Sequence, residues 1–158
     1  KGSLQRTLAL KDFFIRYKVT ALEKSEFIES IQIPLRESSD YFAVYKVSKR
    51  IEDDISAVCL AVRWRLDGET VSDARIAYGG LADIPKRSIT AEETLEGRAL
   101  SESSIREAMA AIAEEFSPID DVRASALYRA TLAKNLLLRA YLATMQGAST
   151  LRVTDYLT

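Results

Sequence analysis

Residues 55–78 read ISAVCLAVRWRLDGETVSDARIAY and decide the fold of this chain. On both sides of Asp67-Gly68, apolar side chains alternate with polar or small ones, a pattern typical of strands that bury one face. Asp-Gly between two such runs is a strong signal for a tight hairpin turn. The stretch therefore predicts an antiparallel pair, with one strand over residues 55–66 and the return strand over residues 70–78.

Further strands are predicted on the N-terminal side of this pair. Residues 41–47 (YFAVYKV) alternate in the same way, and residues 4–10 (LQRTLAL) do so close to the start of the sequence. Asp12 can cap a short helical turn over residues 13–17. Because the first predicted strand has no turn before it, we expect the sequence to be part of a longer polypeptide.

Residues 26–33 (EFIESIQI) predict another strand, which Pro34 ends because proline cannot donate to a sheet. Alternation gives this strand a core face of three apolar residues, namely Phe27, Ile31 and Ile33. Ile28 falls on the opposite, polar face. An isolated isoleucine there is either an ordinary surface residue or a contact for a flat ligand, and the residues alone leave both open.

The C-terminal half of the chain predicts helices. A capping-box pattern begins at Thr90 before a short helix that stops at Gly97, and an amphipathic stripe runs over residues 101–116. A last helix is expected over residues 123–146, with Gly147 as its cap. Because the strands come first and the helices second, the chain is predicted to be α+β, an antiparallel sheet with a helical bundle packed on one face.

Two features outside these elements have more than one interpretation. Six charges surround the turn between the strands at 41–47 and 55–66, the basic ones first: Lys46, Lys49, Arg50, Glu52, Asp53 and Asp54. They form either a solvated loop with local ion pairs, each worth about 0–1 kcal/mol, or a loop that faces a charged ligand. Gly79-Gly80 is either a turn that needs positive φ, which we favour, or a close approach of the backbone to a ligand or partner.

Composition excludes several kinds of chemistry. The sequence has no histidine, so the usual general base and metal ligand are missing, and no metal-ligand spacing or glycine-rich nucleotide motif occurs. Cys59, the single cysteine, lies in the apolar run VCLAV and is expected to be a buried, inert thiol. We therefore expect neither a catalytic side chain nor a metal ligand.

Charge and hydropathy limit the partners and the location. The 22 basic residues are balanced by 23 acidic ones, so a nucleic-acid partner is not expected. No stretch approaches the roughly 20 apolar residues that a membrane-spanning helix needs, and the first residues show no secretory pattern. With a single cysteine that cannot form an internal disulfide, the expected location is the cytoplasm.

Four stretches together resemble one family. They are LALKDFFIRYKVTALEKSEFIESIQIP (8–34), YKVSKRIEDDISAV (45–58), DARIAYGGLADIPKR (73–87) and DDVRASALYR (120–129). Their order and spacing are similar to those of the FAD-binding subunit or domain of molybdenum hydroxylases, most closely the small subunit of bacterial xanthine dehydrogenases. The resemblance covers residues 8–140.

The resemblance implies a division of the chain and an activity. Residues 1–40 would be the end of the FAD-binding domain, residues 41–147 its C-terminal subdomain, and residues 148–158 a tail. In the family, electrons from purine oxidation at a molybdopterin centre pass through two 2Fe-2S clusters to FAD and leave as hydride to NAD+. The implied partners are the molybdopterin-binding large subunit, the iron–sulfur domain and NAD+.

The resemblance also implies site residues. Two flavin contacts of the family map onto Ile28 and Lys46. The segment beside the isoalloxazine ring maps onto Arg50, Glu52, Asp53 and Asp54, whose charges would tune the flavin potential and the admission of NAD+. The family's glycine-rich pyrophosphate loops are not in this sequence, so we expect the chain alone not to retain FAD tightly.

Two alternatives remain beside the xanthine dehydrogenase interpretation. In the first, the chain is a non-catalytic interaction module whose charged loop and Gly79-Gly80 turn dock a partner. In the second, it belongs to the flavoprotein of another molybdenum hydroxylase, one that acts on aldehydes, carbon monoxide or aromatic-CoA substrates. The second differs only in the reducing substrate, which is selected on another chain.

Overall fold

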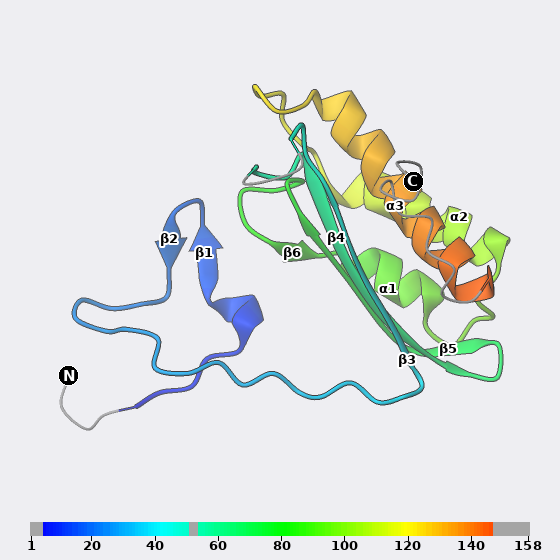
Figure 1. Cartoon of the computed structure of the whole chain (residues 1–158), viewed down its shortest axis with the longest axis horizontal. Helices are drawn as coiled ribbons and strands as arrows, with labels where there is room; N and C mark the ends of the chain where they lie inside the picture. The colour runs from blue at the N-terminus through cyan, green and yellow to red at the C-terminus, as the bar shows by residue number, and fades with distance from the viewer. Residues whose placement is uncertain (1–4, 51–53, 147–158) are drawn as a thin grey trace, which may run out of the picture.

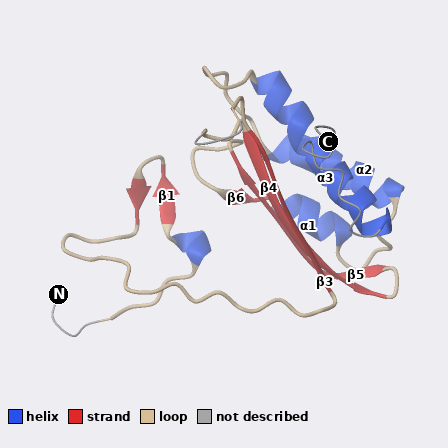
Figure 2. Ribbon diagram, viewed as in Figure 1, coloured by secondary structure: helices blue, strands red, loops and turns tan. Residues whose placement is uncertain are grey.

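The computed structural model describes residues 5–50 and 54–146 and contains a four-stranded antiparallel sheet with three helices on one face (Figure 1). The strands, in their order across the sheet, are β3 (Asp40–Val47), β4 (Val58–Asp67), β5 (Thr70–Gly79) and β6 (Lys86–Arg87). The helices are α1 (Ile89–Leu95), α2 (Glu102–Glu115) and α3 (Ala126–Gln146). The predicted α+β class, with its helices packed on one face of the sheet, is confirmed (Figure 2).

The predicted hairpin is β4–β5. Its register pairs Leu60 with Tyr78 and Val62 with Ile76, and Gly68 in the turn adopts a positive φ of 61°. The alternate residues of β4 that face the helices are almost completely buried: Val58, Leu60, Val62 and Trp64. They belong to one core with buried residues of α2 and α3: Ile105, Ala108, Ile112, Ala133 and Leu137. Each large apolar side chain buried there contributes about 1.5–3 kcal/mol, so this face of the sheet is firmly covered.

The N-terminal segment differs from the prediction. Residues 5–9 form no strand, and a 3-10 turn (η1, Leu10–Asp12) follows them; Leu4 lies outside the described residues. The expected helical turn at 13–17 is instead strand β1 (Phe14–Arg16), which pairs with β2 (Val19–Thr20). A tight turn at Lys18, whose φ is 57°, lets the chain reverse there, so a small hairpin wins over the local helical signal.

The strand predicted over residues 26–33 is absent from the structure. Its expected core residues are exposed instead, Phe27 at 80% and Ile33 at 79%. The segment is held by polar contacts, including a 2.6 Å ion pair between Arg6 and Glu26. A strand needs a neighbour to pair its backbone groups, and no strand among the described residues runs beside this segment. The prediction of a buried face and a polar face was therefore wrong for this chain.

The helices form close to their expected places, with different caps. α1 begins at Ile89 after Ser88, so the capping box expected at Thr90 was wrong. α2 begins with a capping box between Ser101 and Ser104. The expected cap Gly147 and the tail at 148–158 lie outside the described residues. Within the described part of the chain, none of the helices has the length and apolar character required to span a bilayer.

Replacing Leu60 by alanine tests the core. Leu60 is fully buried at the centre of β4, so Leu60→Ala is expected to lower the free energy of unfolding by about 2–5 kcal/mol. Val44→Ala on the neighbouring strand is the control, because Val44 is 53% exposed and its truncation should cost less than about 0.5 kcal/mol. Urea denaturation monitored by Trp64 fluorescence measures both; equal losses would contradict the assignment of the two faces.

Candidate functional site

The face of the sheet opposite the helices, called the open face below, carries a flat strip of small residues. Register places Cys59 of β4 beside Gly79 of β5, and Ala61 beside Ala77. All four are half-buried, and none has a side chain larger than a thiol. We call these four residues, Cys59, Ala61, Ala77 and Gly79, the flat strip. A surface of this kind suits a planar apolar group better than a bulky one.

Lys46 lies at the edge of the flat strip. It is exposed on β3, directly opposite Cys59 in the register. Among the described residues, it has neither a hydrogen-bond partner nor an ion-pair partner. Burial raises the pKa of the Cys59 thiol, and the positive charge of Lys46 acts in the opposite direction. Cys59 was predicted to be buried, but it is half-buried on the open face, with its thiol within electrostatic reach of Lys46.

The other end of the open face is neutralised by its own ion pairs. Arg65 contacts Asp40 at 3.0 Å and Glu37 at 3.0 Å, while Arg63 contacts Asp73 at 2.5 Å. Arg75 contacts the same Asp73 at 2.5 Å. The hydrogen bond from Arg65 holds the pKa of Asp40 below its ordinary value. Because these charges satisfy one another, Lys46 differs from the arginines of this face in having no acidic partner among the described residues.

The charged loop after β3 is only partly described. Arg50 is largely exposed and forms a 3.6 Å pair with Asp54, whose carboxylate also accepts the backbone N–H of Arg50 at 3.0 Å. Burial acts against ionisation of Asp54, but the Arg50 backbone N–H lowers its pKa. Glu52 and Asp53 lie outside the described residues. The described part of the loop thus contains one local ion pair of the kind that the solvated interpretation expects.

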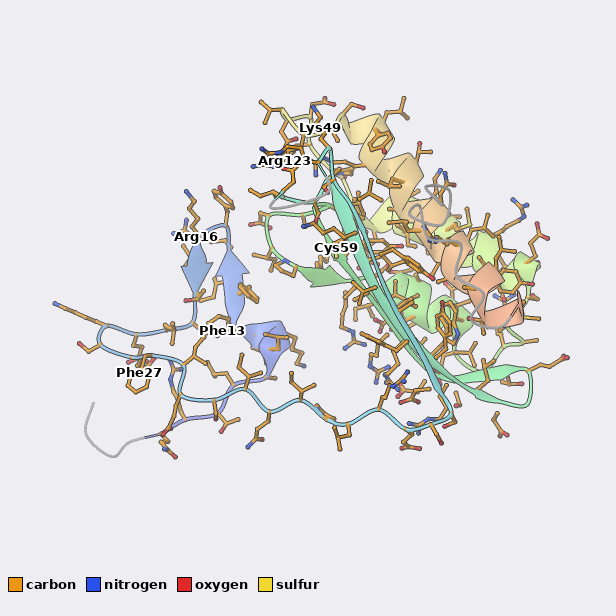
Figure 3. All side chains as sticks on the ribbon, viewed as in Figure 1. Phe13, Arg16, Phe27, Lys49, Cys59 and Arg123 are labelled. Atoms are coloured by element: carbon orange, nitrogen blue, oxygen red, sulfur yellow. The ribbon has the colours of Figure 1, made fainter. Side chains whose placement is uncertain are left out.

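Lys49 ties this loop to the segment before α3. Its Nζ donates a 2.7 Å hydrogen bond to the carbonyl oxygen of Val122, 73 residues along the chain. Figure 3 shows Lys49 and Arg123 at the same end of the sheet. Lys46 and Lys49 are therefore not equivalent, because Lys49 is engaged by the protein and Lys46 has no such partner among the described residues.

Gly80 follows the flat strip and has the positive φ that the turn interpretation required. Its φ is 87°, and a Cβ atom at this position would overlap the carbonyl oxygen of Ala57. The close approach is thus between two backbone segments of the protein itself. Glycine at position 80 lets the end of β5 pack directly against the residue that precedes β4.

Arg129 of α3 holds these segments together. It is 3% exposed, and its Nη1 donates to the carbonyl oxygens of Ala57 (2.6 Å) and Gly80 (2.9 Å). Its Nη2 donates to Asp121 at 2.5 Å. The backbone N–H of Arg123, together with Arg129, lowers the pKa of Asp121. We call this arrangement the Arg129 clamp.

The Arg129 clamp was not predicted from the sequence, although a signal was present. Arg129 is spaced with Ala133, Leu136 and Ala140 on the buried stripe of α3. A single arginine on an otherwise apolar stripe indicates a buried charge that must be paired. The stretch DDVRASALYR contributed to the resemblance, but its arginine was given no role.

Ile28 and Lys46 are not in contact in this chain. Ile28 is 53% exposed on the extended N-terminal segment. Figure 3 shows its neighbour Phe27 on that segment, apart from Cys59 on the sheet, which is the register partner of Lys46. Polar links between this segment and the sheet region include the backbone N–H of Tyr17 to Asp83 at 3.3 Å and Glu37 to Arg65 at 3.0 Å. The shared flavin contact predicted for Ile28 and Lys46 stays a prediction.

Two grooves lie away from these residues. One, of about 410 Å³, runs along β5 and α1 between Ser72 and Glu96, and another, of about 440 Å³, lies between α2 and α3 beside Met109. The first is crossed by the ion pair between Arg87 and Glu92. Within the described part of the chain, no cluster of three carboxylate or thiol groups could hold a metal ion.

Comparison with known proteins identifies the class of this fold. Residues 43–144 match the CO dehydrogenase flavoprotein C-terminal domain, which covers the sheet and most of the helical bundle. The chain therefore belongs to this family. The resemblance to the flavoproteins of molybdenum hydroxylases is confirmed.

Individual relatives span several enzymes. The chain is 28% identical over 140 residues to the glyceraldehyde dehydrogenase medium chain of Sulfolobus acidocaldarius, covering 89% of this chain and 49% of that protein. It is 32% identical over 138 residues to the xanthine dehydrogenase of Emericella nidulans, covering 85% of this chain and 10% of that protein. It thus spans about half the length of the first of these relatives and a small part of the second.

A solved structure has the same fold. It is carbon monoxide dehydrogenase from Hydrogenophaga pseudoflava lacking the Mo-pyranopterin moiety of the molybdenum cofactor, with a TM-score of 0.78 and 29% identity. The match covers 84% of this chain and 47% of that chain. The similarity therefore extends beyond the sheet and helices that the family match covers.

Substitution of Gly80 tests the backbone contact. Gly80→Ala is expected to lower the free energy of unfolding by more than about 2 kcal/mol, because it adds both left-handed strain and a clash with Ala57. Gly68→Ala is the matched control, since Gly68 also has a positive φ but has open space around it. It should cost only about 1 kcal/mol. Equal thermal stabilities of the two variants would show that the clash does not exist.

Substitution of Asp40 tests the ion pairs at the other end of the open face. The lowered pKa of Asp40 stabilises the fold above its unfolded value of about 3.9, and this contribution is lost as the pH falls through the lower folded value. Asp40→Asn should therefore lower stability at pH 7, and its difference from wild type should narrow progressively as the pH falls below about 3.9. Asp67→Asn, in the exposed hairpin, preserves a favoured turn sequence and serves as control. A pH-independent difference between wild type and Asp40→Asn in urea denaturation would contradict the pairing.

Proposed function

We propose that this chain is part of the FAD-binding subunit of a xanthine dehydrogenase-type oxidoreductase, which passes electrons from molybdenum and iron–sulfur centres through FAD to NAD+. The observation that carries the proposal is the flat strip with Lys46 at its edge, a lysine that no described residue pairs, in a chain of the flavoprotein C-terminal domain family. Flavin enzymes need such features, because the protein supplies orientation and electrostatics while the cofactor supplies the hydride chemistry.

The flat strip and Lys46 fit the isoalloxazine half of FAD but not its pyrophosphate half. The isoalloxazine ring is planar and largely apolar, as the flat strip requires, and a lysine beside it stabilises negative charge that develops on the ring. The pyrophosphate half needs converging backbone amides, usually from a glycine-rich loop. This sequence has 6 glycines and no such loop, so in the complete protein another part of the flavoprotein would bind the phosphates.

The family roles suggested by the sequence become specific proposals. Lys46 contacts the flavin from the sheet, and Ile28 contacts it from the N-terminal segment. The charged loop residues Arg50, Glu52, Asp53 and Asp54 lie beside the ring and influence its potential and the approach of NAD+. The assignment of Lys46 is supported by the flat strip and by the absence of a partner for it within residues 5–50 and 54–146, whereas that of Ile28 is supported by its exposure alone.

The proposed domain division accounts for the exposed N-terminal segment. Residues 1–40 would complete the FAD-binding domain, residues 41–147 form its C-terminal subdomain, and residues 148–158 form a tail. In the complete flavoprotein, residues 26–33 would gain a neighbouring strand and bury apolar side chains that are exposed here, such as Phe27 and Ile33. Contact of the same segment with the ring would bring Ile28 to the edge of the flat strip.

The proposed partners follow from the same role. They are a molybdopterin-binding large subunit, an iron–sulfur domain and NAD+, in the cytoplasm, with no nucleic acid and no membrane. The reducing substrate could equally be an aldehyde, carbon monoxide or an aromatic-CoA, since it is bound on another chain. An interaction module is the second candidate, favoured by three exposed apolar residues in the segment that Lys49 contacts through Val122: Ile119, Val122 and Leu127.

Removal of Lys46 tests the site. In the complete flavoprotein, Lys46→Ala is expected to raise the dissociation constant for FAD by roughly 10–100-fold, the effect of losing one charge-assisted hydrogen bond. Lys49→Ala is the matched control, because its Nζ bonds to Val122 and not to a ligand. Flavin fluorescence during titration of the apoprotein measures both variants. Equal effects would remove the basis for assigning Lys46 to the flavin.

A reductase assay separates the two candidate functions. The complete flavoprotein should show a bound-flavin absorbance spectrum and transfer electrons from NADH to an artificial dye. A folded protein that neither binds flavin nor oxidises NADH would favour the interaction module.

A further inference from the structure

The buried guanidinium of Arg129 contacts three segments that are far apart in the sequence. Ala57 precedes β4, Gly80 follows β5, and Asp121 lies in the loop before α3. A buried charge is costly unless it is paired and hydrogen-bonded. The protein pairs this one with a carboxylate and two carbonyl oxygens, so the positions of all three segments are coupled to one side chain.

The planar guanidinium is necessary for this geometry. Nη1 donates to two carbonyl oxygens at once, and Nη2 reaches the carboxylate. Lysine has a single nitrogen on a flexible chain and cannot span the same three acceptors in fixed directions. Arg129 Nε is buried without a hydrogen-bond partner among the described residues. The two terminal nitrogens of the guanidinium thus bridge the three segments, even though Nε makes no hydrogen bond with any described residue.

The Arg129 clamp contacts the backbone next to both ends of a row of register partners that runs across three strands and begins at Lys46. Register aligns Lys46, Cys59 and Gly79 across β3, β4 and β5. Gly80 directly follows this row, and the Ala57 N–H donates a 2.8 Å hydrogen bond to the carbonyl oxygen of Val47, the residue after Lys46. A shift of Ala57 or Gly80 would therefore move Lys46 relative to the flat strip.

The same clamp reaches the charged loop by a second route. Asp121 accepts hydrogen bonds from the backbone N–H groups of Arg123 (2.8 Å) and Ala124 (3.1 Å) as well as from Arg129. Lys49 bonds to Val122 within this short segment. The loop that leaves β3 and the strand that carries Lys46 thus share one anchor on α3.

We propose that Arg129 is a positioning residue for the flavin site, one that fixes Lys46 against the flat strip through the backbone of Ala57 and Gly80 without touching the ligand. The inference rests on the proposed function, since it requires a flavin at the flat strip. It adds a residue that lies on the opposite side of the sheet from that surface, on a helix. Its loss alters flavin binding as well as folding.

The experiment compares Arg129→Lys with wild type in the complete flavoprotein, using FAD itself as the probe. The variant is expected to bind FAD at least about tenfold more weakly and to show a shifted flavin absorption spectrum and midpoint potential. Hydrogen exchange at the backbone amides of Ala57 and Gly80 should accelerate. Arg129→Lys retains the positive charge, so these changes report the lost bridging geometry.

Glu92→Gln is the matched structural control. Glu92 is also buried, joins α1 to β5 through the Ile76 N–H, and pairs with Arg87, away from the Arg129 clamp. It should lower the melting temperature without changing flavin affinity, spectrum or potential. If Arg129→Lys behaves like this control, Arg129 is only structural and the inference is overturned.

A second variant keeps the test decisive if Arg129→Lys does not fold. Asp121→Asn removes the carboxylate that neutralises and orients the Arg129 guanidinium, so its bonds to Ala57 and Gly80 should loosen and FAD binding should weaken in the same direction by a smaller factor. Unchanged affinity in a folded Asp121→Asn protein would overturn the inference. A folded wild-type flavoprotein without affinity for FAD would overturn the proposed function and the inference with it. Normal wild-type binding with unaffected variants overturns the inference alone.

Discussion

The two-residue repeat of β4 is the constraint on which the other features depend. Val58, Leu60, Val62 and Trp64 must face the helices, because they form the centre of the core. Their neighbours must then face away, since successive side chains of a strand point to opposite sides. Cys59 and Ala61 thereby supply the β4 half of the flat strip, and Arg63 and Arg65 form the ion pairs further along the same face. A slip of one residue would exchange core and site together, so stability and the proposed function share one register.

The strong local patterns of the sequence predicted β3, β4, β5 and the three helices, although β4 begins at Val58 and not at Ile55 and the two-residue β6 was missed. The N-terminal segment was mispredicted. The β4–β5 hairpin carries its own turn signal and its own partner strand, so nothing outside residues 58–79 was needed to recognise it. Residues 26–33 have the alternation of a strand but no neighbour among the described residues. Alternation indicates that a segment can bury one face; it does not supply the surface to bury it against. At residues 13–17, pairing across a tight turn outweighed a weak capping signal.

The candidate site likewise has a part that was predicted from the sequence and a part that only the structure reveals. Lys46 was assigned through the family resemblance, because the residues alone placed it only among the six charges around a predicted turn. The structure adds that it has no partner among the described residues. The Arg129 clamp could not be assembled from the sequence, since it joins residues 57, 80, 121 and 129, whose proximity exists only after α3 packs on the sheet. Cys59 was assigned to the core because an apolar run conceals which side chains point outward.

The contrast between the two ends of the open face favours ligand binding over a purely structural surface. At one end, arginines and carboxylates on adjacent strands pair within the sheet, so little attraction is left for a charged partner. At the other end, a buried arginine on the helical side fixes the backbone while the neighbouring lysine is left unpaired by any described residue. A protein that needed Lys46 only for solubility would gain nothing from anchoring the backbone beside it through a buried arginine. A lysine that must contact a flat cofactor in one orientation does benefit from such anchoring. A preorganised charge does not have to be ordered when the ligand binds, so less conformational entropy is lost.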